Sequence, residues 1–141
     1  MRRLMKSIGA FAVFAMMAGG ITAVAAHHSA SMFDFSKSQT LKGKVVEMRW
    51  VNPHVTITIN GSANPDEAPA EWLIETTSPG NLVRAGGWRR DALKPGDEVE
   101  VKFHPERDAG KKSGLLQEVK VVSTGEVFTA NIRDQEKPGL E

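Results

Sequence analysis

The chain has 141 residues, no cysteine, 18 basic and 17 acidic side chains, and a formal net charge of +1. The absence of cysteine excludes disulfides, thiol nucleophiles and a lipid anchor on cysteine. The nearly balanced charge gives no support to a nucleic-acid-binding protein, which needs a basic face. The length fits one domain with a single core.

Residues 1–26 have the pattern of a secretory signal. Arg2, Arg3 and Lys6 form a basic start, and a long uncharged apolar run that ends in small residues follows them. We therefore expect cleavage, with Ala26 as the last residue removed, and no membrane span in the mature chain. The expected location is the bacterial periplasm or the medium, and an exported domain without disulfides suits a periplasm.

Residues 27–141 would then form a mature chain of 115 residues with 15 basic and 17 acidic side chains, a net charge of −2. Its pattern predicts a polar lead-in over 27–40, a small β-barrel domain over 41–128, and a flexible tail over 129–141. Three apolar side chains are expected to hold the lead-in against the barrel: Met32, Phe33 and Phe35.

The first strand is predicted in "LKGKVVEMRW", which begins at Leu41. Its apolar residues follow one phase up to Val45 and the opposite phase from Val46. A phase switch close to Gly43 indicates a bulge or a strong bend, as needed to curl a sheet.

The second strand, "HVTITIN", alternates regularly, with Val55, Ile57 and Ile59 on the inner phase. Asn60 and Gly61, at the end of this strand, are a turn signal. A proline-containing loop, "SANPDEAPA", follows it.

The third strand is predicted in "EWLIETT", and a short helix comes next. Ser78 can cap this helix, Pro79 suits its first position and Gly86 suits its end. Pro95 and Gly96 fit a type II turn, and two further strands follow, "EVEVKFH" and "GLLQEVKVV". A helix between the third and fourth of five strands predicts an all-β, OB-like small barrel. A five-stranded sandwich or a partly open roll is the alternative.

His27 and His28 lie directly after the expected signal. If cleavage follows Ala26, the α-amine and ring Nδ1 of His27 can chelate one metal ion, and a further histidine would complete a three-nitrogen histidine brace. If cleavage follows Ala25, a histidine stands third, the spacing of a square-planar amino-terminal copper site. Planar nitrogen ligand sets suit Cu(II). The alternative is a polar terminus that happens to contain histidines.

The other two histidines lie at strand ends. His54 follows Pro53 at the start of the second predicted strand, and His104 precedes Pro105 at the end of the fourth. Both are on the outer phase of their strands, and either could complete a copper site that begins at His27, since histidine is the commonest metal ligand. The alternative for each is a solvated or hydrogen-bonded histidine.

A second candidate region surrounds Trp88, which follows two glycines and stands among three basic residues: Arg84, Arg89 and Arg90. This group could bind an anion or a carboxylate, or it could be a solvated patch with Trp88 folded inward. By strand phase, Trp50 and Trp72 are expected to pack in the core. The chain has no phosphate loop, no nucleophile elbow and no HExxH pair, and we therefore expect no enzyme.

The chain resembles an uncharacterised bacterial exported family, domain-of-unknown-function family 6152, over nearly all of the mature chain. The most specific matching segments contain all four histidines. These segments are His27-His28-Ser29, Asn52-Pro53-His54, Ser78-Pro79 through Gly87-Trp88, Leu93-Lys94-Pro95-Gly96-Asp97 and His104-Pro105. The resemblance implies cleavage after Ala26, because members usually begin with His-His-Ser. Members often have an aromatic residue where this chain has Ala30, and the family implies no activity.

Together these patterns predict a small periplasmic β-barrel that binds copper through His27, with His28, His54 and His104 as partners, for binding or delivery of the metal. A metal-free module that binds a periplasmic protein or envelope ligand through the Trp88 region is the alternative. A copper oxygenase with a histidine brace is a third hypothesis, for which the sequence offers no substrate platform.

Overall fold

The computed structural model describes residues 30–85 and 87–130. In chain order, the elements of this part are the 3₁₀ turn η1 (Ala30–Met32), β1 (Gln39–Arg49), β2 (Thr56–Ser62), β3 (Ala70–Glu75), α1 (Pro79–Ala85), β4 (Glu98–Pro105), β5 (Ser113–Val121) and β6 (Val127–Thr129). No helix in the described part of the chain is long and apolar enough to cross a membrane. The expected signal, residues 1–26, lies outside the described residues.

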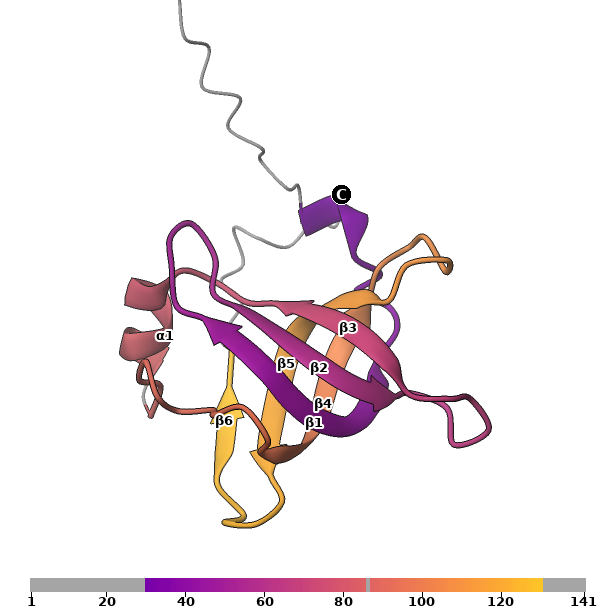
Figure 1. Cartoon of the computed structure of the whole chain (residues 1–141). Helices are drawn as coiled ribbons and strands as arrows, with labels where there is room; N and C mark the ends of the chain where they lie inside the picture. Colours follow the sequence, from indigo (N-terminus) through magenta and orange to yellow (C-terminus); the bar gives the residue numbers. More distant parts are fainter. Residues whose placement is uncertain (1–29, 86, 131–141) are drawn as a thin grey trace, which may run out of the picture.

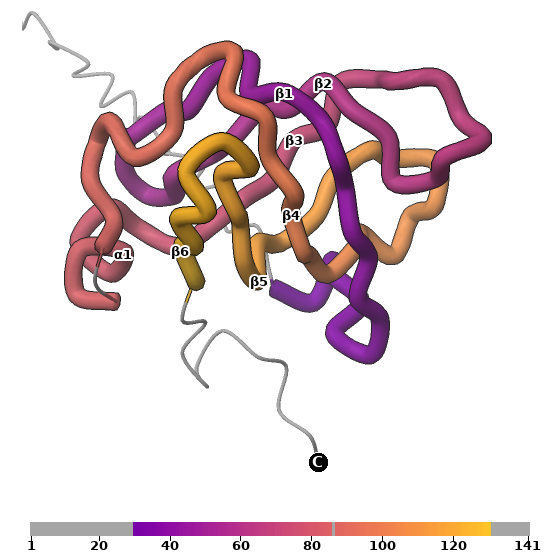
Figure 2. The backbone as a smooth tube through the Cα atoms, turned by 90° about the horizontal axis from the view of Figure 1, so that it is seen from below, coloured from indigo at the N-terminus to yellow at the C-terminus, as the bar shows by residue number. Residues whose placement is uncertain are grey.

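The strands close into a barrel (Figures 1 and 2). Their order in the sheet is β3-β2-β1-β4-β5-β6, and an additional pairing of β3 with β5 joins the two sides. This closing pair is parallel and aligns Glu75 with Leu115, whereas the other strand pairs are antiparallel. The fold class predicted from the sequence is therefore confirmed: β1 to β5 form a closed barrel, and a short helix lies between β3 and β4.

Two features permit the strong bend of β1: a bulge and a close contact between two glycines. The register against β2 shifts between Val45 and Glu47, which is the bulge that the phase switch predicts. Gly43 faces Gly61 across this pair, and a Cβ on Gly43 would lie 2.7 Å from the Gly61 Cα and 2.4 Å from the Asn60 carbonyl oxygen. The two backbones approach so closely only because neither residue has a side chain. This bend lets β1 pair with β2 and with β4.

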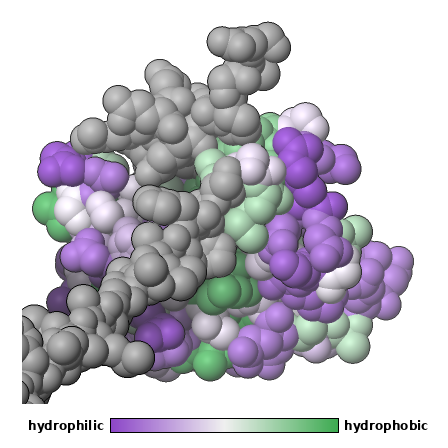
Figure 3. Space-filling view, turned by 90° about the horizontal axis from the view of Figure 1, so that it is seen from above, coloured by the Kyte–Doolittle hydropathy of each residue, from purple (hydrophilic) through white to green (hydrophobic). Residues whose placement is uncertain are grey.

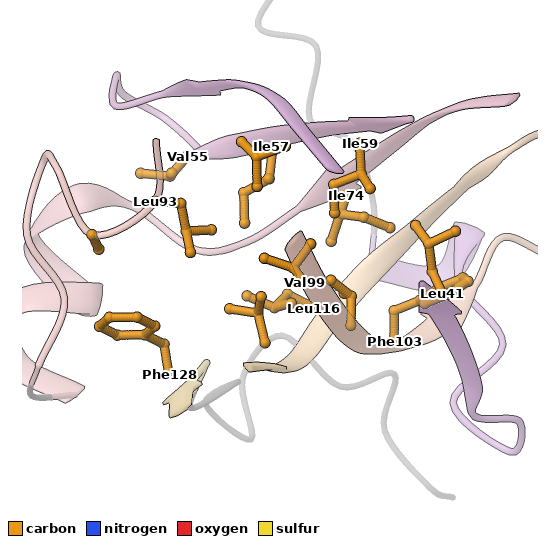
Figure 4. Packing of buried hydrophobic residues seen from close by; sticks show 14 of the residues in the cluster. Leu41, Val55, Ile57, Ile59, Ile74, Leu93, Val99, Phe103, Leu116 and Phe128 are labelled. Carbon is orange, nitrogen blue, oxygen red and sulfur yellow. The ribbon is translucent and has the colours of Figure 1, made fainter. Parts of the chain in front are cut away.

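Buried apolar side chains from the surrounding elements pack together inside the barrel (Figure 4). The alternating apolar residues of β2 and β4 point inward, as predicted, and are fully or almost fully buried. The largest fully buried side chains come from all six strands, α1 and the residue that precedes β2: Phe103, Phe128, Leu41, Ile57, Ile59, Ile74, Leu82, Leu116, Val55, Val99, Val101 and Val119. Burial of each such side chain contributes roughly 1.5–3 kcal/mol relative to its exposure.

The helix and the turn before β4 lie where the sequence predicts them. The Asn81 amide donates to the Ser78 hydroxyl at 3.3 Å, which caps the start of α1. At the turn, the Asp97 amide donates to the Lys94 carbonyl at 3.0 Å, and Gly96 has a φ of 91°. A positive φ at the third position is what a type II turn requires.

Two local predictions are wrong. Asn60 and Gly61 do not form a turn, because β2 continues through them to Ser62. The chain reverses in the loop after Ser62, and Gly61 instead serves the close contact with Gly43. The short strand β6 lies in a segment for which the sequence predicts no strand, and only Phe128 of its three residues is buried.

Candidate functional site

His54 stands in the connection between β1 and β2, two residues before β2 begins. Its half-buried ring places Nδ1 3.1 Å from the backbone oxygen of Thr76, which follows β3. A carbonyl oxygen can only accept, so Nδ1 carries the hydrogen of this bond. In the neutral ring, the lone pair is then on Nε2, the nitrogen that remains for a ligand.

His104 stands near the end of β4 and has the same arrangement. Its Nδ1 lies 2.7 Å from the backbone oxygen of Lys37, and its ring contacts the Phe35 ring with centroids 5.0 Å apart. Nδ1 again must donate, because the partner is a carbonyl oxygen. Nε2 of the neutral ring is thereby left as an electron-pair donor, and the ring orientation is fixed by two contacts from the lead-in.

The lead-in, residues 30–38 of the described chain, packs tightly against the end of β4. Phe33 is only 3% exposed and forms an isolated β-bridge with Glu106. The Asp34 amide donates to the Pro105 carbonyl at 2.8 Å, and the Arg107 amide donates to the Met32 carbonyl at 2.9 Å. The buried Phe33 therefore holds this segment against the barrel, as predicted for it, and backbone hydrogen bonds hold it as well.

The lead-in and the β1–β2 connection lie at different places on the barrel. Figure 1 places η1, in indigo, at the top of the barrel, away from α1 and the β1–β2 connection at the left. The same separation is visible from below in Figure 2. Seen from above, the molecule presents apolar surface between strongly hydrophilic areas (Figure 3).

Asp34 and Glu106, the carboxylates of this region, both have hydrogen-bond and ion-pair partners within the protein. Hydrogen bonds from Ser36 and an ion pair with Lys37 at 3.2 Å hold the pKa of Asp34 down at about 2. A hydrogen bond from Ser113, with Lys111 at 2.9 Å, lowers the pKa of Glu106. Both groups are therefore charged at neutral pH and satisfied by protein donors, so the histidines are the better candidates for ligands.

The two described histidines are separated along the sheet. His104 pairs with Leu115 of β5, Leu115 pairs with Glu75 of β3, and Glu75 pairs with Thr56 of β2, two residues beyond His54. By this route, three strand pairings separate His104 from Thr56, and His54 lies two residues before Thr56. The described residues include no group of three or more histidine, cysteine or carboxylate side chains that could hold a metal ion. His27 and His28 lie outside the described residues.

Trp88, the centre of the second candidate region, is buried. It is 4% exposed, its ring lies against Phe128 with centroids 5.0 Å apart, and its Nε1 donates to the Thr129 carbonyl at 2.8 Å. Trp88 thus joins the segment after α1 to β6 and presents no ring face to solvent. Trp72 is also buried, at 7% exposed, and Trp50 packs partly buried against the core, as predicted for both.

The arginines near Trp88 are largely occupied. Arg89 contacts Asp91 at 3.2 Å and Glu126 at 3.4 Å, and its guanidinium lies 5.9 Å from the Phe128 ring centroid. Arg84 donates to the Asn81 side chain of the same helix. Arg90 is exposed. In the described part of the chain, Arg89 alone of the three arginines therefore contacts an acidic side chain, and the buried Trp88 ring gives no open face beside them.

Two shallow hollows of about 360 Å³ each lie elsewhere, on either side of Lys42. One is crossed by the ion pairs of Lys42 with Glu100 and of Lys44 with Glu98, both at 3.6 Å. The other lies between the start of β1 and the end of β2. The two described histidines, His54 and His104, are not among the residues that line either hollow.

Sequence reasoning missed the groups that orient the two histidines. These groups are the backbone oxygens of Lys37 and Thr76 and the ring of Phe35. Backbone oxygens carry no sequence signal, because every residue has one. Phe35 was expected to pack against the barrel, but its contact with a histidine depends on the path of the lead-in.

The model of a protein family of unknown function, DUF6152, matches residues 15–117. The matched region is more than half of the chain and includes all four histidines. No curated protein and no solved structure matches the chain. The chain therefore belongs to the DUF6152 family, as its resemblance predicts.

Proposed function

We propose that this DUF6152 member is an exported protein that binds copper through its mature amino terminus. His27, freed by cleavage after Ala26, supplies its α-amine and ring Nδ1. His28, His54 and His104 are the candidate partners, and the role is binding or delivery of the metal.

One observation carries the proposal. Both described histidines donate Nδ1–H to a backbone carbonyl, His54 to Thr76 and His104 to Lys37. Histidines that bind metals almost always have such a partner on the second ring nitrogen, because it fixes the tautomer and the ring orientation. Neutral imidazole nitrogens then serve as ligands without the loss of a proton from the ring. The barrel thus supplies oriented nitrogen donors, which suit Cu(II).

The set of copper ligands at the terminus depends on whether the signal is cleaved after Ala26 or after Ala25. A cut after Ala26 makes His27 residue one and gives the amine and imidazole of a brace. A cut after Ala25 gives Ala26-His27-His28, in which His28 stands third, and the amine, two deprotonated amides and this imidazole form a square plane. Intact-mass analysis of the secreted protein, with and without copper, measures which terminus exists and whether it binds the metal.

The binding test uses correctly processed, untagged protein, because a tag blocks the amine. We expect Cu(II) to bind more tightly than micromolar, and His27→Ala to weaken binding strongly. Protein acetylated at the α-amine of His27 is the matched control, since it keeps both imidazoles and removes the amine nitrogen as a ligand. Micromolar or weaker binding that His27→Ala leaves unchanged would contradict the proposal.

A further inference from the structure

We infer that two copies of this chain pack against each other through the outer surface of β1, β2 and β3. These strands lie side by side across one side of the barrel (Figure 1). The interface uses no histidine, so the inference goes beyond the proposed copper binding and is independent of it. The pattern of apolar and charged side chains on this surface makes a second copy the occupant that fits it.

The outward side chains form three rows that cross β1, β2 and β3 in that order, because the pairing of the strands aligns them. In the middle row, Glu47 pairs with Thr58, and the bulge in β1 adds Val46 beside Glu47. All of the side chains in the rows are exposed or half-buried. We call this surface the three-row face, and its rows are Arg49-Thr56-Glu75, Val46-Thr58-Leu73 and Lys44-Asn60-Glu71.

The middle row exposes large apolar side chains. Val46 is 46% exposed and Leu73 is 41% exposed, although they stand on different strands. The short side chain of Thr58 lies between them. Apolar side chains that gather on a surface and have a polar rim mark contact sites for other macromolecules. The three-row face has such a rim, because the rows on both sides of Val46 and Leu73 are polar.

The polar rows carry opposite charges at their two ends. On β1, these rows begin with the basic residues Arg49 and Lys44. On β3, they end with the acidic residues Glu75 and Glu71. With Glu47 included, the net charge is +1 on the β1 side and −2 on the β3 side. Two strand spacings, about 9.6 Å, separate the basic end of a row from its acidic end, so the ends face outward rather than each other.

These charged ends are available for a partner. In the described part of the chain, no ion pair involves Arg49, Glu71 or Glu75. Lys44 contacts Glu98 of β4 at 3.6 Å, and both side chains are more than half exposed. An exposed ion pair of this kind contributes little to stability, so Lys44 can exchange it for another carboxylate.

A two-fold axis parallel to β2 brings the opposite ends together. Rotation about this axis lays β1 of one protomer over β3 of the other and keeps each row opposite the same row. Arg49 then faces the partner's Glu75, and Val46 faces the partner's Leu73. In the same way, the basic end of the third row faces an acidic end. Each contact occurs twice, as in an isologous dimer, and the strands stay aligned, as in the face-to-face packing of sheets.

The size of the three-row face sets the strength of the dimer. Its three strands are about 4.8 Å apart and belong to a curved barrel. We therefore expect the interface to bury less than about 1,200 Å² in total, the range of weak and transient complexes. Because exposed charges form its rim, added salt should weaken the dimer.

Sedimentation velocity of the metal-free mature protein measures the dimerisation constant at concentrations from about 1 μM to about 1 mM, which span weak association. The charge variants are Arg49→Glu, Glu75→Arg and the double variant that combines them. Arg90→Glu, at an exposed side chain after α1, controls for the reversal of a charge. Leu73→Ser tests the middle row, and Val83→Ser, at a side chain of α1 that is 58% exposed, is its control. Circular dichroism verifies the fold of each variant.

We expect the wild type and both control variants to dimerise with the same affinity. Arg49→Glu and Glu75→Arg should each weaken the dimer at least about tenfold, because like charges then face each other across the interface. The double variant should recover the affinity of the wild type, because its two reversed charges are again opposite. Leu73→Ser should weaken the dimer as well.

A wild type that stays monomeric, or a double variant as weak as the single variants, would overturn the inference. A monomeric wild type that binds an oligosaccharide or another protein through Leu73 would assign the three-row face to that occupant and overturn it too. Copper is absent from these measurements, so their failure leaves the proposed function standing.

Discussion

His104 donates its Nδ1 hydrogen to the backbone oxygen of Lys37 across 2.7 Å, although 67 positions separate the two residues in sequence. The bond joins a strand end of the barrel to a segment that has little secondary structure of its own. The lead-in is therefore part of the folded domain rather than a spacer before it.

Phe33 should contribute much of the attachment. The side chain is 3% exposed, and Phe33→Ala removes its buried surface, so we expect a loss of about 3–5 kcal/mol in the free energy of unfolding. Urea unfolding measures this loss. Val83→Ala, at a side chain that is 58% exposed, is the control and should change stability by no more than about 0.5 kcal/mol. A Phe33 variant as stable as this control would show that the lead-in is not held by its aromatic residue.

The close contact of Gly43 with Gly61 predicts that alanine destabilises the protein at position 43, whereas alanine at the unobstructed Gly80 stabilises it. Gly43→Ala places a Cβ against the backbone of Asn60 and Gly61, which cannot move without breaking the pairing, and we expect at least about 1–3 kcal/mol of destabilisation. Gly80→Ala makes the same substitution in α1, where nothing lies within 4 Å, and should stabilise by about 0.4–1 kcal/mol. Thermal unfolding of the two variants measures both signs, and equal shifts would contradict the proposed cause of the bend.

Acid should loosen the lead-in. The folded pKa of Asp34 is about 2 against an ordinary value of 3.8, so the folded form holds the proton more weakly than the unfolded form. The contribution of Asp34 to stability is therefore complete above the unfolded pKa and is lost as the pH falls through about 2. The lowered pKa of Glu106 acts in the same direction.

Urea unfolding at several pH values between 6 and 2 measures this effect. Asp34→Asn should reduce stability at pH 6 and should approach the wild type at the acid end, since the carboxylate no longer contributes there. Asp66→Asn, at an exposed aspartate in the β2–β3 loop, controls for the loss of a negative charge. A difference between Asp34→Asn and the wild type that stays constant with pH would contradict the assignment.

Trp88 should act as a structural residue. Trp88→Phe keeps an aromatic ring against Phe128 and removes the bond from Nε1 to the Thr129 carbonyl. We expect a loss of about 0.5–1.5 kcal/mol, the usual contribution of one hydrogen bond, with no change in copper affinity. Denaturant unfolding and copper titration of the same variant measure both quantities. Unchanged stability combined with lost binding to an envelope partner would instead support the alternative role of this region.

The local patterns of the sequence determined most of the barrel, because each rests on neighbouring residues. Alternation in β2 and β4 specified which side chains point inward, Ser78 and Pro79 marked the start of α1, and the phase switch near Gly43 marked the bulge. The sequence does not predict β6, because three residues with one buried side chain are too few to show an alternating pattern. Contacts with β5 and Trp88, which are distant in sequence, fix the position of this strand. The turn predicted at Asn60-Gly61 is wrong because the glycine at position 61 is needed for the close backbone contact with Gly43 on the neighbouring strand.

For the candidate site, too, the sequence predicts one part and the tertiary structure decides the rest. The sequence alone determined which side chains are the candidate copper ligands, because two histidines directly follow the expected signal and two lie at predicted strand ends. Only the tertiary structure decided how two of them are oriented, since the partners of His54 and His104 are backbone oxygens, which are identical at every residue until the chain folds. It also decided which strand end lies beside the lead-in, because the bridge from Phe33 to Glu106 joins segments 73 positions apart through packing that no local pattern encodes.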